Sequence, residues 1–118
     1  DGDTVNVYID AKIAKTPSRR CITAQNNAAR LLKYCKDNNL TETYPKNFRK
    51  RFDRLKAATE IEWSNNILRH SFGTYRYALT DSADATSKEM GNSPAILKKH
   101  YNRPVAKSDA EKFFELEI

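Results

Sequence analysis

The amino-acid sequence predicts a mainly α-helical domain with one β-hairpin at its N-terminal end. Residues 4–9 alternate between apolar and polar types, and a turn-prone segment follows them. From about residue 24 onward, apolar residues recur at spacings of three and four, which is the period of an α-helix. The 118 residues are within the size of one domain and long enough to bury a core.

The hairpin is predicted from two short β-type stretches. Residues 4–9 place Val5, Val7 and Ile9 on one face of a strand. The basic stretch 10–19 contains Thr16-Pro17-Ser18, which favours a turn. A second strand is expected at about residues 20–23, so the two strands enclose a basic loop.

Two helices are expected in the middle of the chain. Thr23 is expected to cap a helix over about residues 24–37. Its apolar face consists of Ala28, Leu31, Leu32 and Cys35. Pro45 favours the first turn of a second helix, which runs to about Ala57 and carries Phe48, Phe52 and Leu55 as an apolar stripe.

The second helix is strongly cationic outside that stripe. Its basic residues are Lys46, Arg49, Lys50, Arg51, Arg54 and Lys56. This surface is either a solvated helix face or a face that contacts phosphate groups.

Four further helices are expected in the C-terminal half. Ser64 or Asn65 starts a helix to about residue 79, whose buried stripe is Leu68, Phe72, Tyr75 and Leu79. Asp81-Ser82 caps a helix that Gly91 ends, and Pro94 opens a short helix to about Tyr101. A last amphipathic helix over about residues 108–116 presents Phe113, Phe114 and Leu116.

Charge and composition narrow the class of protein. The net charge is +6, and the acidic segment 109–118 contributes −3, so residues 1–108 carry +9. Such a surplus favours a polyanionic partner, although a merely soluble basic domain has the same balance. Cys21 and Cys35 have no metal-ligand spacing and favour a reducing interior. No apolar stretch approaches the roughly 20 residues that span a bilayer.

Three segments of the sequence resemble motifs of the tyrosine recombinase (phage integrase) family. Residues 66–75, Asn-Ile-Leu-Arg-His-Ser-Phe-Gly-Thr-Tyr, resemble the family pattern His-x-Leu-Arg-His-Ser-Phe. Residues 90–94, Met-Gly-Asn-Ser-Pro, resemble its Leu-Gly-His-Ser segment, and Tyr101 follows Asn92 by the nine residues that the family keeps. Residues 14–20, Ala-Lys-Thr-Pro-Ser-Arg-Arg, resemble its hairpin motif. The resemblance covers about residues 4 to 105.

The resemblance implies a fold and an activity. The chain would be the C-terminal portion of a recombinase catalytic domain, with the N-terminal part of that domain and any arm-binding domain missing. The activity would be site-specific DNA cleavage and rejoining through a 3′-phosphotyrosyl intermediate. Tyr101 would attack, Arg69 would bind the scissile phosphate, and Lys15 would protonate the leaving 5′-oxygen. Asn92 and Asn66 would support the phosphate.

These residue types suit that chemistry. Attack on a phosphodiester places negative charge on the non-bridging oxygens, which a fixed guanidinium stabilises bidentately. A tyrosine with a pKa near about 10 needs a neighbouring base or cation to lose its proton. Each residue also has an ordinary interpretation: Tyr101 follows Leu97 by four residues, the spacing of a core aromatic, and Arg69 could be a surface arginine.

The expected partners follow from the same resemblance. They are double-stranded DNA and further copies of the chain in a tetramer on DNA, in a bacterial or phage-derived cytoplasmic setting. No membrane is expected, and no metal or cofactor either, because the sequence has no P-loop and no Cys/His ligand cluster. Phe113, Phe114 and Leu116 would dock on a neighbouring copy or pack on their own chain. The residues expected to contact DNA are Arg19, Arg20, Lys46, Arg49, Lys50, Lys98, Lys99 and Arg103.

The sequence departs from the family pattern at three points. Asn66 and Asn92 stand where the family has His, and His or Trp; an amide can donate a hydrogen bond but cannot take up a proton near pH 7. The departures mark either altered acid–base chemistry or a decayed enzyme. The family's first catalytic arginine lies before the hairpin and is expected to be missing, which costs about 10²–10³ in rate. The 118 residues alone are therefore expected to cleave DNA poorly.

Two other classes of protein remain open: a non-catalytic DNA-binding module on the same scaffold, and a basic protein-interaction domain. The enzyme hypothesis expects the Tyr101 hydroxyl, the Arg69 guanidinium and the Asn92 amide to converge on one phosphate-sized spot. A Tyr101 sealed in the apolar interior, with no route back to the surface, would leave only a kinship in fold.

Overall fold

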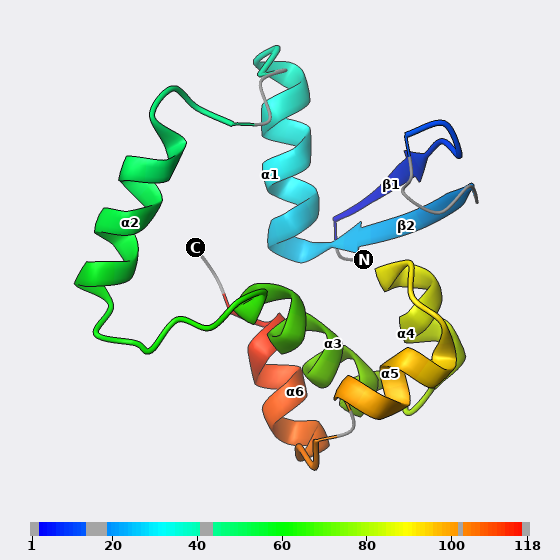
Figure 1. Ribbon diagram of the computed structural model, residues 1–118. Helices are drawn as coiled ribbons and strands as arrows, with labels where there is room; N and C mark the ends of the chain where they lie inside the picture. The colour runs from blue at the N-terminus through cyan, green and yellow to red at the C-terminus, as the bar shows by residue number, and fades with distance from the viewer. Residues whose placement is uncertain (1–2, 14–18, 41–43, 102, 117–118) are drawn as a thin grey trace.

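The computed structural model describes residues 3–13, 19–40, 44–101 and 103–116. This part of the chain forms two strands and six helices in the predicted order (Figure 1). The mainly α-helical prediction with one hairpin is confirmed. The elements are β1 (Thr4–Ile9), β2 (Arg20–Gln25), α1 (Asn26–Asp37), α2 (Phe48–Ala58), α3 (Ile67–Thr80), α4 (Ala83–Met90), α5 (Pro94–Tyr101) and α6 (Lys107–Phe114).

The hairpin pairs β1 and β2 antiparallel, from Thr4 opposite Gln25 to Ile9 opposite Arg20. The alternation is as predicted: the odd-numbered residues of β1 are half-buried and the even-numbered ones exposed. β2 is longer than predicted, so Thr23 is a strand residue and not a helix cap. Its hydroxyl donates to Oδ1 of Asn6 across the hairpin (2.9 Å). The loop residues 14–18, with Lys15, lie outside the described residues.

The C-terminal half packs around α3, which contacts α4, α5 and α6. Met90, Leu97 and Tyr101 form the buried core cluster of this half. Phe113 stacks on Tyr75 with ring centroids 4.3 Å apart, and Phe114 lies edge-on to Phe72 at 5.9 Å. The two phenylalanines of α6 therefore pack on their own chain, whereas Leu116 is 67% exposed.

The helix boundaries are set by polar caps and left-handed residues. The Ser82 hydroxyl accepts a hydrogen bond from the backbone N–H of Ala85, which confirms the predicted cap of α4. Gly91 ends α4 with φ +69°, also as predicted. α3 begins after Asn66, one or two residues later than predicted, and Asn66 has φ +58°. Asparagine tolerates this conformation better than most residues.

The predicted apolar stripes are less buried than expected. Leu68 is 64% exposed, because the face of α3 that packs inward passes through Gly73 instead. On α1 only Ala29 is buried, and Leu31 is 51% exposed. On α2, Phe48 and Leu55 are exposed and Phe52 is only half-buried. The periodicity therefore located these helices correctly but misjudged how much of each apolar face is covered.

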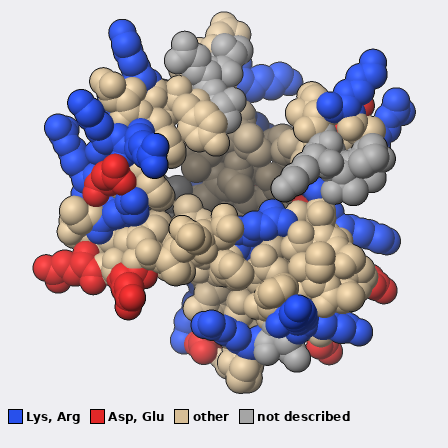
Figure 2. Space-filling view, in the orientation of Figure 1, with Lys and Arg blue, Asp and Glu red and all other residues tan. Residues whose placement is uncertain are grey.

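The molecule is open around its middle. Within the described residues, no other element packs against α2, and Figure 2 shows a hollow in the face bordered by α1, α2 and α3. The radius of gyration is 15.7 Å, whereas a compact domain of this length has about 13.5 Å. The best-packed scaffold for a site is therefore the α3–α6 half.

Candidate active site

Arg69 and Asn92 meet at the turn that follows α4. Arg69 lies in the first turn of α3, and its Nη2 donates to the Met90 carbonyl (2.7 Å) and to Oδ1 of Asn92 (2.9 Å). Residues 23 positions apart in the sequence are thus joined because Gly91 turns the chain back toward α3. Both bonds leave from one nitrogen, and a guanidinium has five N–H donors, so the Arg69 side chain has further donors to offer an anion.

The contact also fixes the orientation of Asn92. Its Oδ1 accepts from Arg69, and its backbone N–H donates to the Ser87 carbonyl (2.9 Å). The amide NH₂ is therefore the end of the side chain that can donate to a ligand. This orientation suits a phosphate oxygen as the acceptor, as the resemblance implies for this position.

Tyr101 is placed differently from the expectation. It is 5% exposed and belongs to the core cluster with Met90 and Leu97. A Cβ at Gly73 would lie 2.7 Å from Cδ1 of Tyr101, so the absence of a side chain at Gly73 makes room for the ring. The His70 ring lies beside it, at 5.1 Å between centroids. In this conformation the phenol is a core residue and is not presented for attack on DNA.

Tyr101 nevertheless lies close to the arginine site. The Met90 side chain packs on the cluster that contains Tyr101, while the Met90 carbonyl accepts from Arg69. Tyr101 is also the last residue of the short helix α5. Release of the ring to the surface would remove it from the core, which costs about 1.5–3 kcal/mol.

Asn66 does not join this group among the described residues. It is exposed at the start of α3, and its carbonyl accepts from the backbone N–H of His70 (2.9 Å). The left-handed backbone at position 66 by itself favours asparagine, independently of any contact with phosphate. Lys15 lies outside the described residues.

A groove of about 740 Å³ lies next to Tyr101, between α3, the end of α5 and the segment after it. His70, His100 and Arg103 give it cationic or titratable groups. The remaining lining residues are Ser64, Asn65, Ile67, Ser71, Thr74, Tyr75 and Val105. Arg103 was expected to contact DNA; the hydroxyl residues were missed, because residues from three separate segments give no local sequence signal.

The residues expected to contact DNA occupy several surfaces. Lys98 and Lys99 are exposed on α5, and Lys46, Arg49 and Lys50 are exposed at the start of α2. Figure 2 shows basic side chains over α2 and around the hollow. Since α2 does not pack on the α3–α6 half, the structure does not join these groups into one continuous patch.

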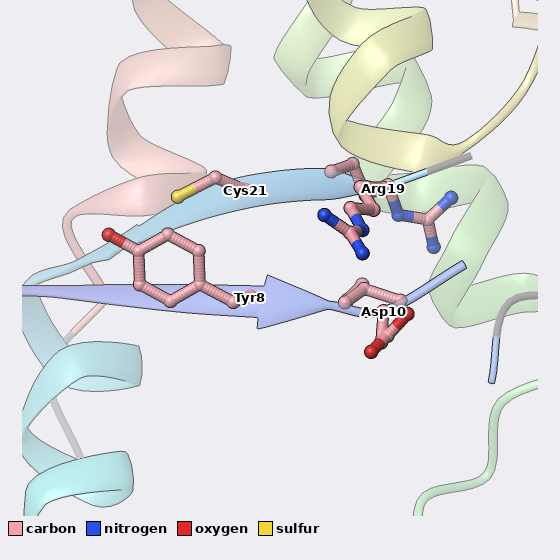
Figure 3. Close-up of a pocket in the computed structure, with 6 residues that line it drawn as sticks. Tyr8, Asp10, Arg19 and Cys21 are labelled. Atoms are coloured by element: carbon pink, nitrogen blue, oxygen red, sulfur yellow. The ribbon is translucent and has the colours of Figure 1, made fainter. Parts of the chain in front are cut away.

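Arg19 and Arg20 differ in their surroundings. A concavity of about 350 Å³ at the loop end of the hairpin is lined by both arginines and by Tyr8, Ile9, Asp10 and Cys21. Figure 3 shows Tyr8 and Cys21 side by side along the strands, with Asp10 and Arg19 at the loop end. Arg19 is exposed, whereas Arg20 is half-buried and lies against Gly91. Sequence reasoning treated both as surface cations and missed this contact.

Metal-binding side chains do not gather in the described part of the chain. Among those residues, no group of three or more His, Cys, Asp and Glu side chains could hold a metal ion. No helix in the described ranges is long and apolar enough to cross a membrane. No family model, no curated protein and no solved structure matches the chain.

Proposed function

We propose that the protein is a DNA strand-cleaving and rejoining enzyme of the tyrosine recombinase type. The observation that carries the proposal is the pairing of Arg69 with Asn92 at the turn after α4. The resemblance assigns both positions to phosphate binding, and their side chains meet although they lie far apart in the sequence.

The proposed chemistry uses side chains alone. Arg69 and the Asn92 amide bind the non-bridging oxygens of the scissile phosphate and stabilise the charge that develops there. Tyr101, released from its core position, gives its proton to solvent water, and its oxygen forms a bond to phosphorus. The bond from phosphorus to the 5′-oxygen breaks, and Lys15 supplies the proton to that oxygen. The 3′-phosphotyrosyl bond then permits rejoining by the reverse steps without ATP.

The proposed partner is double-stranded DNA, on which the chain would assemble as a homotetramer. The family pattern includes a further phosphate-binding arginine that the matched segments of this chain do not contain, so reaction on an ordinary phosphodiester is expected to be slow. A methylphosphonate in the scissile position removes the negative charge that this arginine would stabilise. Cleavage of a methylphosphonate is therefore expected to depend less on that arginine than cleavage of a phosphodiester does.

The test is covalent capture of DNA. The chain is incubated with a pool of randomised duplexes that contain either phosphodiester or methylphosphonate linkages. Each duplex is nicked, so that the fragment released with a 5′-hydroxyl diffuses away. After denaturation, protein-linked DNA is measured. Adduct is expected from the original chain, more with methylphosphonate, and none from Tyr101→Phe, which should still bind DNA. Equal adduct from Tyr101→Phe would overturn the assignment of the nucleophile.

A second candidate function is a non-catalytic DNA-binding module on the same scaffold. The burial of Tyr101, at 5% exposure, favours this candidate. The module would form no adduct with either linkage, and Tyr101→Phe would bind DNA as the original chain does. The same experiment therefore separates the two functions.

A further inference from the structure

The side chain of Arg20 crosses from the hairpin onto the turn that holds Asn92. A methyl group at Gly91 would overlap Nη1 of Arg20 and lie 2.6 Å from its Cζ, so the guanidinium rests directly on the glycine. Gly91 has φ +69°, a conformation that already favours glycine. Two features therefore favour glycine at position 91: a side chain there would strain the backbone, and it would displace Arg20.

Arg69 reaches the same turn from α3. It hydrogen-bonds Met90 and Asn92, the two neighbours of Gly91. Two guanidinium groups from distant elements therefore meet on three consecutive residues. Both groups carry a positive charge, so an anion bound at this turn would be attracted to both.

No protein group among the described residues supplies that anion. Within the described ranges neither Arg20 nor Arg69 forms an ion pair, and Glu89, the acidic residue nearest to the turn in sequence, is engaged by Arg76 through two hydrogen bonds (2.8 and 2.7 Å). Nε of Arg20 is buried and finds no acceptor in the part of the chain that the structure describes. A buried charged donor without an acceptor indicates a ligand or water that the protein itself does not provide.

We infer that Arg20 and Arg69 together bind one backbone phosphate of DNA, with the Met90–Asn92 turn between them. Arg20 is then a phosphate-binding residue of the proposed active site and supplies a second guanidinium from within the described chain. The inference rests on the proposed function for the identity of its ligand. It does not require that the phosphate be cleaved.

Binding of a duplex of arbitrary sequence tests the inference without cleavage. The dissociation constant is measured from low to high salt for the original chain, Arg20→Ala, Arg69→Ala and the double variant. Loss of a charged hydrogen-bonding partner is expected to weaken binding about 10-fold in each single variant. If both arginines hold one phosphate, the double variant is weakened by less than the product of the two effects.

The salt dependence of binding gives an independent count of the phosphates that the two arginines neutralise. Each neutralised phosphate contributes about 0.9 to the slope of log Kobs against log salt. The double variant should lose about 0.9, for one shared phosphate, whereas two separate phosphate contacts would cost about 1.8. Lys112→Ala, which removes a charge that is 77% exposed on α6, should leave the slope unchanged.

One further variant guards against misfolding of Arg20→Ala. Arg20→Lys keeps the charge without the planar fork and should restore part of the affinity. Multiplicative effects, a slope loss near about 1.8, or an Arg20→Ala variant that behaves like Lys112→Ala would each overturn the inference. None of these outcomes depends on covalent capture. The proposed function can therefore fail while the phosphate site shared by Arg20 and Arg69 is confirmed, and the shared site can fail while the proposed function is confirmed.

Discussion

At the scale of single residues, Gly73 explains how Tyr101 fits into the core. A Cβ there would approach the Tyr101 ring to 2.7 Å and the Met90 thioether to 2.9 Å. An exposed helical glycine replaced by alanine gains about 1 kcal/mol, but overpacking a core costs about 1–3 kcal/mol. Gly73→Ala is therefore expected to lower the free energy of unfolding in urea, because the ring and the backbone of α3 cannot both yield. A variant more stable than the original chain would contradict this packing.

Asp3 gives the N-terminal strand a pH dependence. Its carboxylate lies 2.7 Å from Nζ of Lys33 and 3.4 Å from Nε of Arg30. The hydrogen bond from Lys33 and its positive charge lower the pKa of Asp3 below its ordinary value; desolvation opposes this shift, and Arg30 adds a smaller lowering. A lowered pKa in the folded state means that the contact stabilises the fold above the unfolded value and is lost as pH falls through the folded one.

The corresponding measurement compares Asp3→Asn with the original chain across pH. The difference in Tm is expected to be present at neutral pH and to disappear in acid, below the ordinary aspartate range. A difference in Tm that stays the same down to about pH 2 would show that the contact does not depend on the charge of Asp3.

At the scale of elements, α3 and α4 are joined by an ion pair of two hydrogen bonds. Nε and Nη2 of Arg76 bind the two carboxylate oxygens of Glu89, and the side chains are 21% and 24% exposed. The hydrogen bond to Glu89 raises the pKa of Arg76. Glu89→Gln is expected to cost about 1–2 kcal/mol in urea unfolding, since partly buried charged bonds are stronger than exposed ones.

The chain offers a matched control for this prediction. Lys112 and Asp109 lie 3.8 Å apart on α6 and are 77% and 60% exposed. Because solvent screens such pairs, Asp109→Asn should change stability by less than about 1 kcal/mol. Equal losses from the two variants would mean that the α3–α4 pair contributes no more than a surface contact.

The elements themselves could be predicted from the sequence, because period, caps and breakers are local properties. Ser82, Gly91 and Pro94 fixed the ends of α4 and α5 within a residue or two. The covered face of a helix is a tertiary property, which is why Leu68 was expected to be buried and is exposed. The pairing of Arg69 with Asn92 was expected from the resemblance, whereas the contact of Arg20 with Gly91 has no signal in the sequence. Tyr101 was expected at the phosphate site but lies in the core, because its spacing from Leu97 fits a core residue as well as a nucleophile.

At the scale of the whole molecule, the chain divides into two packed halves. The hairpin packs with α1, and α3 packs with α4, α5 and α6; within the described residues the halves meet where β2 contacts α4 and where Asn27 donates to the Leu116 carbonyl. Since no described element packs against α2, its amides are expected to exchange with solvent quickly.

The division into two halves predicts which elements a mutation in the core destabilises. Leu97 is fully buried in the cluster of the second half, so Leu97→Ala should cost about 2–5 kcal/mol. Hydrogen exchange should accelerate in α3–α6, change less in the hairpin and α1, and leave α2 as it was. Uniform acceleration along the chain would show that the halves unfold as one unit.

Burial of Tyr101 also has a chemical consequence. Tyr8, Tyr34 and Tyr44 are 77%, 60% and 67% exposed, so oxidants and nitrating reagents in solution reach their phenols, whereas Tyr101 at 5% is shielded. On the proposed function, this burial would protect the nucleophile from damage in the absence of DNA, and the phenol would become vulnerable to such reagents only when DNA draws the ring out.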